Sequence, residues 1–154
     1  MTNVLVHIKF CYKLLVFDDF HRACDNASPE FAVNTMTIPT EITLHQKSKT
    51  LEIAFDDGAR YRLLFEFLRV HSPSAEVRGH GLGQEILQVG KQNVNLLEVV
   101  PVGSYALKLV FDDGHDSGLY TWDYLHELGR NQDARWRDYL RQMEEAGESR
   151  EPHH

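Results

Sequence analysis

The sequence predicts an α+β domain with a mostly antiparallel sheet, built from two related strand-turn-strand-helix units and followed by a C-terminal helix. Three observations carry this prediction. Apolar and polar residues alternate on both sides of two Asp-Gly pairs, at residues 57–58 and 113–114, as in antiparallel hairpins. The phrase FDDG occurs twice, at 55–58 and 111–114. Strand patterns precede helical ones, which is typical of α+β folds.

The first 35 residues do not resemble the rest of the chain. The run VLVHIKFCYKLLVF has the composition of one strand, and DNASPEFAVNT that of a loop. Met36 opens the regular alternation. We therefore expect residues 1–35 to be a poorly ordered N-terminal extension, residues 36–146 to be the domain, and residues 147–154 to be a solvated tail.

The first unit begins at Ile38. In EITLHQKSKTLEIAF, apolar residues alternate around a polar turn, which predicts two strands. Asp57-Gly58 should form a type I′ turn that leads into a third strand, ARYRLLF. A short helical turn, FEFLRVH, should end at Ser72-Pro73, because the residue before a proline disfavours the helical region.

A long irregular segment separates the two units. Residues 71–93 have no sustained period and contain four glycines. A loop of this length inside a compact domain is usually functional or mobile.

The second unit repeats the pattern. VNLLEVVPVGSYALKLVF supplies two strands, and Asp113-Gly114 supplies a second hairpin, regular or bulged. Thr121 should N-cap the helix WDYLHEL, which Gly129 should end. Asn131 should cap the last helix, whose apolar residues fall on one face: Trp136, Tyr139, Leu140 and Met143.

The two units match residue by residue. Leu51, Ile53 and Phe55 correspond to Leu107, Leu109 and Phe111, and after one added residue FEFL (65–68) corresponds to WDYL (122–125). Units of this size cannot bury their apolar faces alone, so we expect them to pack together. The paired aspartates are interpreted as turn formers, since aspartate hydrogen-bonds its own backbone.

Composition excludes several classes of function. A net charge of −7 disfavours binding to nucleic acid, and no apolar run reaches the roughly 20 residues that a membrane span needs. Neither Cys11 nor Cys24 belongs to a CxxC pair, so a disulfide scaffold is not expected. The sequence has no signal-peptide pattern, which predicts a cytoplasmic protein. It also lacks a His-x-Asp/Glu oxygenase motif, a GK[ST] phosphate loop and a GxSxG elbow.

Two phrases, SPSAEV-x-GHG and DGH-x-S-x-x-Y-x-W-x-(Y/W)-L, resemble the gamma-butyrobetaine hydroxylase-like N-terminal domain. The likeness covers about residues 38–142. In carnitine-pathway hydroxylases that domain precedes an iron- and 2-oxoglutarate-dependent catalytic domain, and it is also found attached to P-loop ATPases that handle iron–sulfur clusters. In bacteria it forms small stand-alone proteins of unknown function. The resemblance therefore implies an accessory module.

The resemblance also bears on His115. In the hydroxylases this domain holds zinc through one histidine, which falls on His115, and three cysteines, which fall on Ser72, Ser74 and Val77. Serine and valine cannot replace thiolate ligands, so the implied zinc site lacks three of its four ligands. A rearranged iron or zinc site would combine His115 with another ligand: His71, His80, Asp113 or Asp116. Otherwise His115 and His80 are hydrogen-bonded loop residues, and His115 braces the second hairpin against residues 71–93.

We expect a non-enzymatic accessory or binding module that docks on a protein partner in iron or iron–sulfur metabolism. Residues 71–93 would supply the contact, since recognition usually lies on loops held by a rigid scaffold. The candidate binding residues are Ser72, Ser74, Arg78 and His80. The alternative is a metal-binding protein or small metalloenzyme that uses His115 with His80 or His71. The sequence leaves the cofactor, the partner's identity and the oligomeric state open.

Overall fold

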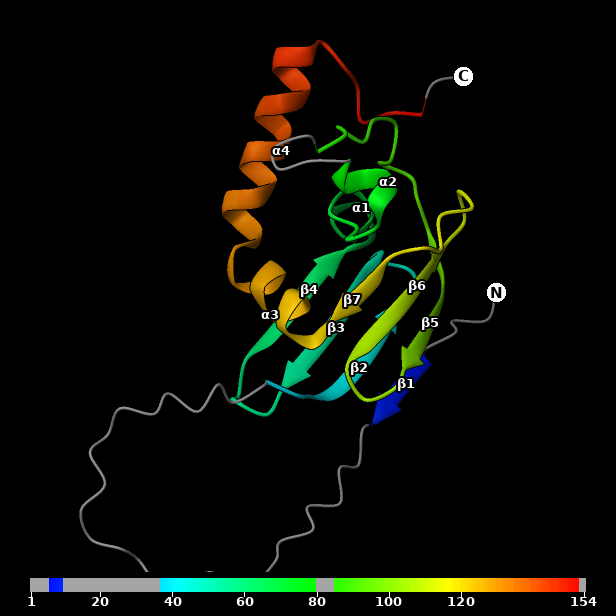
Figure 1. Ribbon diagram of the computed structural model, residues 1–154, viewed down its shortest axis with the longest axis vertical. Helices are drawn as coiled ribbons and strands as arrows, with labels where there is room; N and C mark the ends of the chain where they lie inside the picture. Colours follow the sequence, from blue (N-terminus) through cyan, green and yellow to red (C-terminus); the bar gives the residue numbers. More distant parts are fainter. Residues whose placement is uncertain (1–5, 10–36, 80–84, 153–154) are drawn as a thin grey trace, which may run out of the picture.

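The computed structural model describes the backbone of residues 6–9 and the whole of residues 37–79 and 85–152. The elements follow one another in the order shown in Figure 1. The strands are β1 (Val6–Lys9), β2 (Pro39–His45), β3 (Thr50–Phe55), β4 (Arg60–Leu64), β5 (Leu96–Val102), β6 (Ala106–Phe111) and β7 (Leu119–Thr121). The helices are α1 (Phe65–Val70), α2 (Ala75–Arg78), α3 (Trp122–Arg130) and α4 (Gln132–Ala146).

The strands form two antiparallel sheets, in the orders β1-β2-β3-β4 and β5-β6-β7. Each unit contributes three strands and a helix, which confirms the predicted α+β fold with two related halves. β1 lies inside the predicted extension and pairs with β2 from Val6↔Leu44 to Lys9↔Glu41. The remainder of residues 1–35 lies outside the described residues, so the domain boundary at residue 36 stays a prediction.

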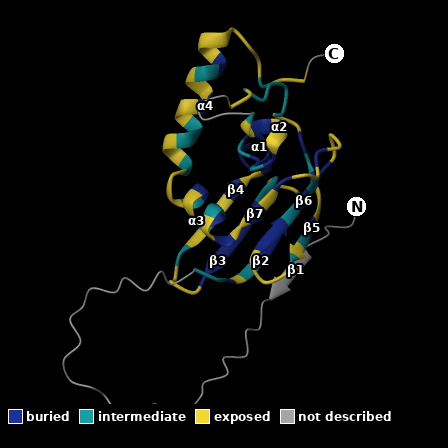
Figure 2. Cartoon of the chain, in the orientation of Figure 1, coloured by how far each residue is buried: buried dark blue, intermediate teal, exposed yellow. Residues whose placement is uncertain are grey.

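Both units bury their matched residues in one shared core. Leu51, Ile53 and Phe55 are at most 3% exposed, and their counterparts in the second unit are equally buried. In Figure 2 the buried positions follow the strands and α1, whereas much of α4 faces solvent. The repeated pattern predicted this shared core, because units of this size cannot bury their apolar faces alone.

The two FDDG turns are built in the same way. The first aspartate of each, Asp56 or Asp112, accepts a hydrogen bond from the residue before the unit's first strand, at 3.1 and 3.0 Å. The second aspartate of each turn accepts a hydrogen bond from the backbone N–H two residues later, at 2.9 Å from Ala59 and 3.2 Å from His115. The aspartates are therefore turn formers, as predicted.

The turn type differs from the prediction. Gly58 and Gly114 each have φ of 86°, but Asp57 is not among the described residues with positive φ. A type I′ turn needs positive φ at both central residues, so that prediction is wrong. The bulged form, with glycine alone in the left-handed region, fits both turns.

Each turn reaches across to the helix of the other unit. Asp57 Oδ2 lies 2.8 Å from His126 Nε2 in α3, and Asp113 Oδ2 accepts a hydrogen bond of 2.9 Å from Arg69 Nε in α1. His126 and Arg69 occupy equivalent positions, one residue after the matched WDYL and FEFL phrases. The halves are thus held together by two reciprocal contacts in addition to the core.

Helix α3 begins as predicted, with Thr121 Oγ1 accepting a hydrogen bond from Tyr124 N at 3.3 Å. It does not end at Gly129, because the helix continues to Arg130. A Cβ at Gly129 would lie 2.3 Å from the Tyr61 ring. Glycine is required here for close packing between α3 and β4, so the prediction that it ends the helix is wrong.

Replacing Gly129 with alanine should destabilise the protein by about 1–3 kcal/mol, because overpacking outweighs the gain in helix propensity of about 1 kcal/mol. Urea unfolding measures this loss. Arg130→Ala, at an exposed position in the same turn, is the control and should change stability little. Equal stabilities of Gly129→Ala and wild type would contradict the packing role.

Helix α4 differs in two details from its prediction. Tyr139 and Met143 are buried, but Leu140 is 37% exposed. The Asn131 side chain makes no capping hydrogen bond at the start of the helix. After Gly147 the backbone turns back, and the carbonyls of Ser149 and Arg150 accept hydrogen bonds from Gly90 and Gln92 at 3.0 and 2.9 Å. The tail is therefore attached to the long irregular segment.

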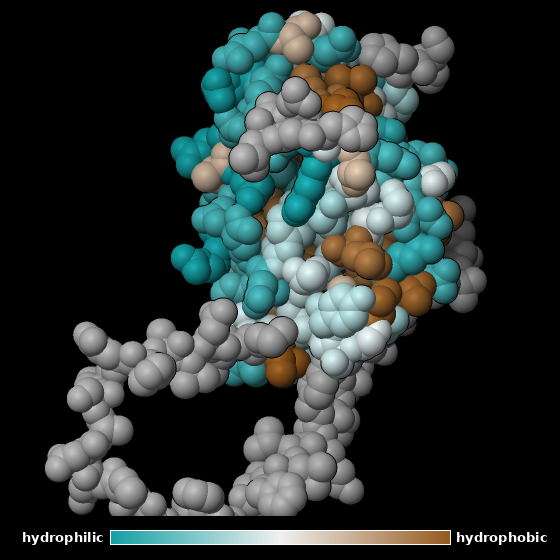
Figure 3. Space-filling model, viewed as in Figure 1, coloured by the Kyte–Doolittle hydropathy of each residue, from teal (hydrophilic) through white to brown (hydrophobic). Residues whose placement is uncertain are grey.

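The described surface is uneven in polarity. Exposed apolar side chains include Leu97, Tyr105 and Leu119, and Figure 3 shows apolar patches over β6 and β7 beside the more hydrophilic helices. Within residues 6–9, 37–79 and 85–152, no helix has the length and apolar character needed to cross a membrane.

Candidate functional site

His115 lies directly after the second FDDG turn and is 6% exposed. Its Nε2 is 2.8 Å from Ser72 Oγ and 3.4 Å from Ser74 Oγ, and its Nδ1 is 3.2 Å from Glu76 Oε2. A carboxylate can only accept, so Nδ1–H donates to Glu76 and Nε2 accepts from serine. We call these four residues, His115, Ser72, Ser74 and Glu76, the His115 brace. They join the second hairpin to the segment after α1.

The turn fixes the position of His115. Phe111 N donates to His115 O at 3.0 Å, and His115 N donates to Asp113 Oδ1 at 3.2 Å. Ala59 occupies the equivalent place in the first unit and offers no polar group beyond its backbone. Of these two equivalent residues, only His115 has a polar side chain, and it contacts residues 72–76.

An ion pair supports the brace. Asp113 Oδ2 accepts hydrogen bonds from Arg69 Nε at 2.9 Å and from Lys91 Nζ at 2.6 Å. Partial burial of the Asp113 carboxyl works against its charged form, but Lys91 and Arg69 outweigh that effect and lower its pKa. The three residues come from α1, the irregular segment and the second turn, so this contact fastens all three together.

The Ser72 hydroxyl is enclosed. Ser72 is 1% exposed, and a Cβ at Gly118 would lie 2.4 Å from its Oγ. Tyr120 is buried beside it and donates from its hydroxyl to Leu68 O at 2.6 Å; burial raises the pKa of Tyr120. Ser72, His115 and Glu76 have the connectivity of a nucleophilic triad. Gly118 packs against the Ser72 hydroxyl on one side, and Ser72 also lines the cavity of about 210 Å³ described below.

The brace brings together positions that the resemblance implied for zinc. Ser72 and Ser74 meet His115, and Val77 lies on α2, three residues after Ser74, with 5% exposure. The donors present do not fit zinc, because neutral hydroxyls and a valine are not zinc ligands. Among the residues with described side chains, no group of three or more His, Cys, Asp or Glu could hold a metal. His80 lies outside the described residues, so a site that includes it stays a prediction.

His71 faces a different part of the surface. Its Nδ1 lies 2.9 Å from Phe67 O, and its ring packs 4.5 Å from the Phe67 ring. Burial lowers the pKa of His71. His71 lines two adjoining cavities of about 70 and 210 Å³, which we call the helix groove. The lining shared by both cavities is Val70, His71, Val77, Glu85 and Arg135.

Arg78 at the end of α2 and Glu85 in the irregular segment line the groove, and both are exposed. The Arg78 guanidinium lies 5.3 Å from the centre of the Tyr124 ring, and both residues line the larger cavity. Arg135 of α4 is paired with Glu127 of α3. Sequence reasoning selected Arg78 and His71 but missed Tyr124, Glu85 and Arg135. No pattern in the sequence indicates that α3 and α4 contribute to the same cavity.

Stability should fall as the pH drops from 7.5 to 5.5. Burial lowers the pKa of both His71 and His115, and Arg69 adds to the effect at His115. Unfolded histidines take up protons near pH 6.5, before the folded ones do, so the unfolded state binds more protons in this range. The stabilisation is present above pH 6.5 and is lost as the pH falls toward the folded-state pKa values. Urea unfolding at the two pH values measures it; a higher free energy of unfolding at pH 5.5 would contradict this assignment.

Comparison with known proteins agrees with this architecture. The family model described as gamma-butyrobetaine hydroxylase-like, N-terminal, matches residues 42–126. No curated protein matches the chain. Two proteins with NMR solution structures are similar to it. The first is 57% identical with a TM-score of 0.68, and the match covers 77% of this chain and 94% of that protein. The second is 47% identical with a TM-score of 0.67, and the match covers 82% of this chain and 92% of that protein.

A third similar structure comes from a named family. It is the crystal structure of a protein of unknown function from Acidithiobacillus ferrooxidans, described as a member of the DUF971 family. It is 43% identical with a TM-score of 0.50 and covers 59% of this chain and 91% of its own. The family model spans more than half of the present sequence, including both FDDG turns and the His115 brace. The chain belongs to the gamma-butyrobetaine hydroxylase-like N-terminal domain family.

Proposed function

We propose that this protein is a non-enzymatic binding module of the cytoplasm that docks on a protein partner in iron or iron–sulfur metabolism. One observation carries the proposal. The helix groove has walls from α1, α2, residues 85–88, α3 and α4, and its exposed Arg78 and Glu85 have no ion-pair partner among the described residues. A groove with an unpaired charge of each sign is suited to a partner segment that carries both.

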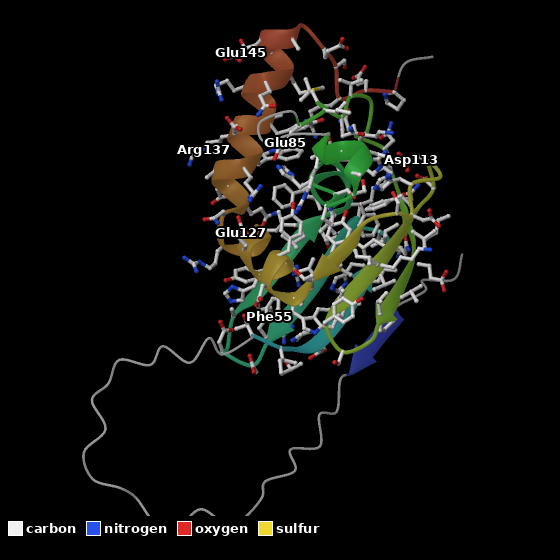
Figure 4. The ribbon with its side chains drawn as sticks, in the orientation of Figure 1. Phe55, Glu85, Asp113, Glu127, Arg137 and Glu145 are labelled. Carbon is white, nitrogen blue, oxygen red and sulfur yellow. The ribbon has the colours of Figure 1, made fainter. Side chains whose placement is uncertain are left out.

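The geometry of Arg78 supports recognition of a carboxylate. A guanidinium stacked on an aromatic ring is held in place while its edge keeps hydrogen-bond donors available. Val70 and Val77 line both cavities of the groove, although they are only 8% and 5% exposed. In Figure 4, Glu85 lies between α1 and α4, where a basic side chain of the partner would meet it. Polar groups around an apolar centre are the usual arrangement of a protein interface.

The brace supports the non-enzymatic part of the proposal. Its serine, histidine and carboxylate have catalytic connectivity, yet Ser72 is enclosed by Gly118 and Tyr120. The same contacts hold residues 72–76 rigidly next to the groove. Rigid placement of one wall lowers the entropy cost of binding.

Photo-crosslinking in the native cell tests the docking surface. A photoreactive amino acid would replace Gln142, which lines the smaller cavity, or Arg62, whose side chain is 70% exposed on β4. We expect a defined partner to be crosslinked from position 142 and not from position 62. Arg78→Glu should abolish that crosslink. Arg137→Glu should not, because Arg137 lies on the outer side of α4, away from the groove (Figure 4).

Two results would contradict the proposal. One is an identical set of crosslinked proteins from positions 142 and 62. The other is a crosslink from position 142 that Arg78→Glu does not change. Metal analysis of the crosslinked partner tests the assignment to iron metabolism: bound iron or an iron–sulfur cluster supports it, and a metal-free partner rejects that part.

A further inference from the structure

We propose that the turn between β2 and β3 forms one wall of a binding site for a small oxyanion, with phosphate or carboxylate groups as the ligand chemistry. A cavity of about 280 Å³ lies beside this turn, on a different set of residues from the helix groove. The turn contributes Lys47, Ser48 and Lys49 to its lining, and the tail contributes Arg150. Leu64, Phe65 and Val94 also line it, and of these Leu64 is exposed.

The lysines of this cavity differ from the other lysines whose side chains are described. Four lysine side chains lie in the described ranges 37–79 and 85–152. Lys91 and Lys108 are paired with Asp113 and Asp116. Neither Lys47 nor Lys49 has a carboxylate partner among the described residues, although the chain has 23 acidic and only 16 basic residues. Both lysines line the same cavity, and an anion bound there would be attracted to both ammonium groups.

The backbone of the turn favours the same interpretation. Lys49 has φ of 52°, and it is the one non-glycine residue in the described part of the chain with positive φ. Glycine takes this conformation without steric cost, whereas a side chain rarely adopts it. Lys49 Nζ donates one hydrogen bond to Asn93 O at 3.1 Å, which leaves two of its three hydrogens for a ligand. Lys49 thus adopts an unfavourable backbone conformation at a position where its side chain lines the cavity.

The one carboxylate among the described residues that line this cavity, Glu66, is already paired with Arg150. Arg150 donates to both oxygens of the buried Glu66, at 2.9 and 2.7 Å, and its guanidinium lies 5.0 Å from the Trp136 ring centre. Because Arg150 occupies the Glu66 carboxylate, Glu66 is not available to pair with the lysines. The cavity therefore keeps the positive charge of Lys47 and Lys49 beside a rigid polar wall. Charge-assisted hydrogen bonds from ammonium to phosphate or carboxylate oxygen are the contacts such a site would make.

NMR titration of the ¹⁵N-labelled protein at pH 7.5 tests the site. The probes are inorganic phosphate, pyrophosphate and citrate, each compared with sodium chloride at equal ionic strength. We expect saturable shifts, with at least one oxyanion, confined to residues 47–49, 64–66, 92–94 and 150. The titrations also separate the two ligand chemistries. Stronger binding of pyrophosphate would assign the site to phosphate groups, and stronger binding of citrate would assign it to carboxylate groups.

Lys49→Gly separates binding from folding. Glycine suits the positive φ, so the variant should fold with an unchanged or higher Tm, yet its oxyanion affinity should fall about tenfold with the loss of one charge-assisted contact. Lys47→Gln should weaken binding by a similar factor. Lys108→Gln removes a lysine on β6 that is already paired and should bind as wild type does. Shifts that chloride reproduces, or wild-type affinity in both Lys49→Gly and Lys47→Gln, would overturn the proposal.

Discussion

Joint replacement of Ser72, Ser74 and Val77 by cysteine is expected to create a zinc site and to make the melting temperature depend strongly on zinc. Ser72 Oγ and Ser74 Oγ lie 2.8 and 3.4 Å from His115 Nε2. Zn–S and Zn–N bonds of about 2.3 and 2.0 Å place thiolate and imidazole at similar separations, so small movements would suffice at positions 72 and 74. Free zinc a thousandfold above the dissociation constant would stabilise the fold by about 4 kcal/mol, or roughly 10 °C or more in Tm.

Two controls test whether His115 is one of the zinc ligands. His115→Ala in the triple-cysteine background should lose most of the zinc-dependent shift, because one of four ligands is gone. The wild-type protein carries the same histidine with hydroxyls around it and tests the metal-binding alternative directly. Stoichiometric metal in the wild-type protein that disappears in His115→Ala would support that alternative. A triple-cysteine protein that folds but gains no zinc would show that the brace is not preorganised for tetrahedral coordination.

Arg69→Leu should cost about 3 kcal/mol of unfolding free energy. The Arg69 side chain is 8% exposed and contacts Asp113, whose side chain is 22% exposed, and also Gln88 Oε1 at 3.1 Å. Removing one partner of a buried ion pair leaves the other charge desolvated, which typically costs 3–5 kcal/mol. Lys91 still pairs with Asp113, so we expect a value at the lower end. Urea unfolding at pH 7.5 measures it.

The first unit provides a matched control. His126 stands where Arg69 stands in the repeat, and it contacts Asp57, whose side chain is 40% exposed. His126 also packs against the Phe55 and Tyr61 rings at 4.9 and 5.5 Å, contacts that leucine would partly keep. His126→Leu should therefore destabilise the protein clearly less than Arg69→Leu. Equal losses in the two variants would show that burial does not distinguish the two reciprocal contacts.

Much of the fold was predictable because its signals are local. Alternating apolar residues define the strands. In each Asp-Gly pair, the aspartate accepts a hydrogen bond from the backbone N–H two residues later. Thr121 as an N-cap, and the single core shared by the two units, follow from the same short-range patterns. The errors also have local causes: glycine at 129 has the same appearance whether it ends a helix or makes room for a neighbouring ring. The type I′ turn failed because an Asp-Gly pair fits a bulged turn equally well.

What the sequence determined by itself is the repeated unit, the α+β class and, through its phrases, the family. Tertiary structure decided the sites, because their members lie far apart in the chain and only packing brings them together. Ser72 meets His115 across 43 residues, Arg150 meets Glu66 across 84, and Tyr139 of α4 donates to Gln88 O across 51. Periodicity reports which face of an element is buried, but not which distant side chain it will touch. That partner is set by how the two halves close on each other, which depends on the whole core at once.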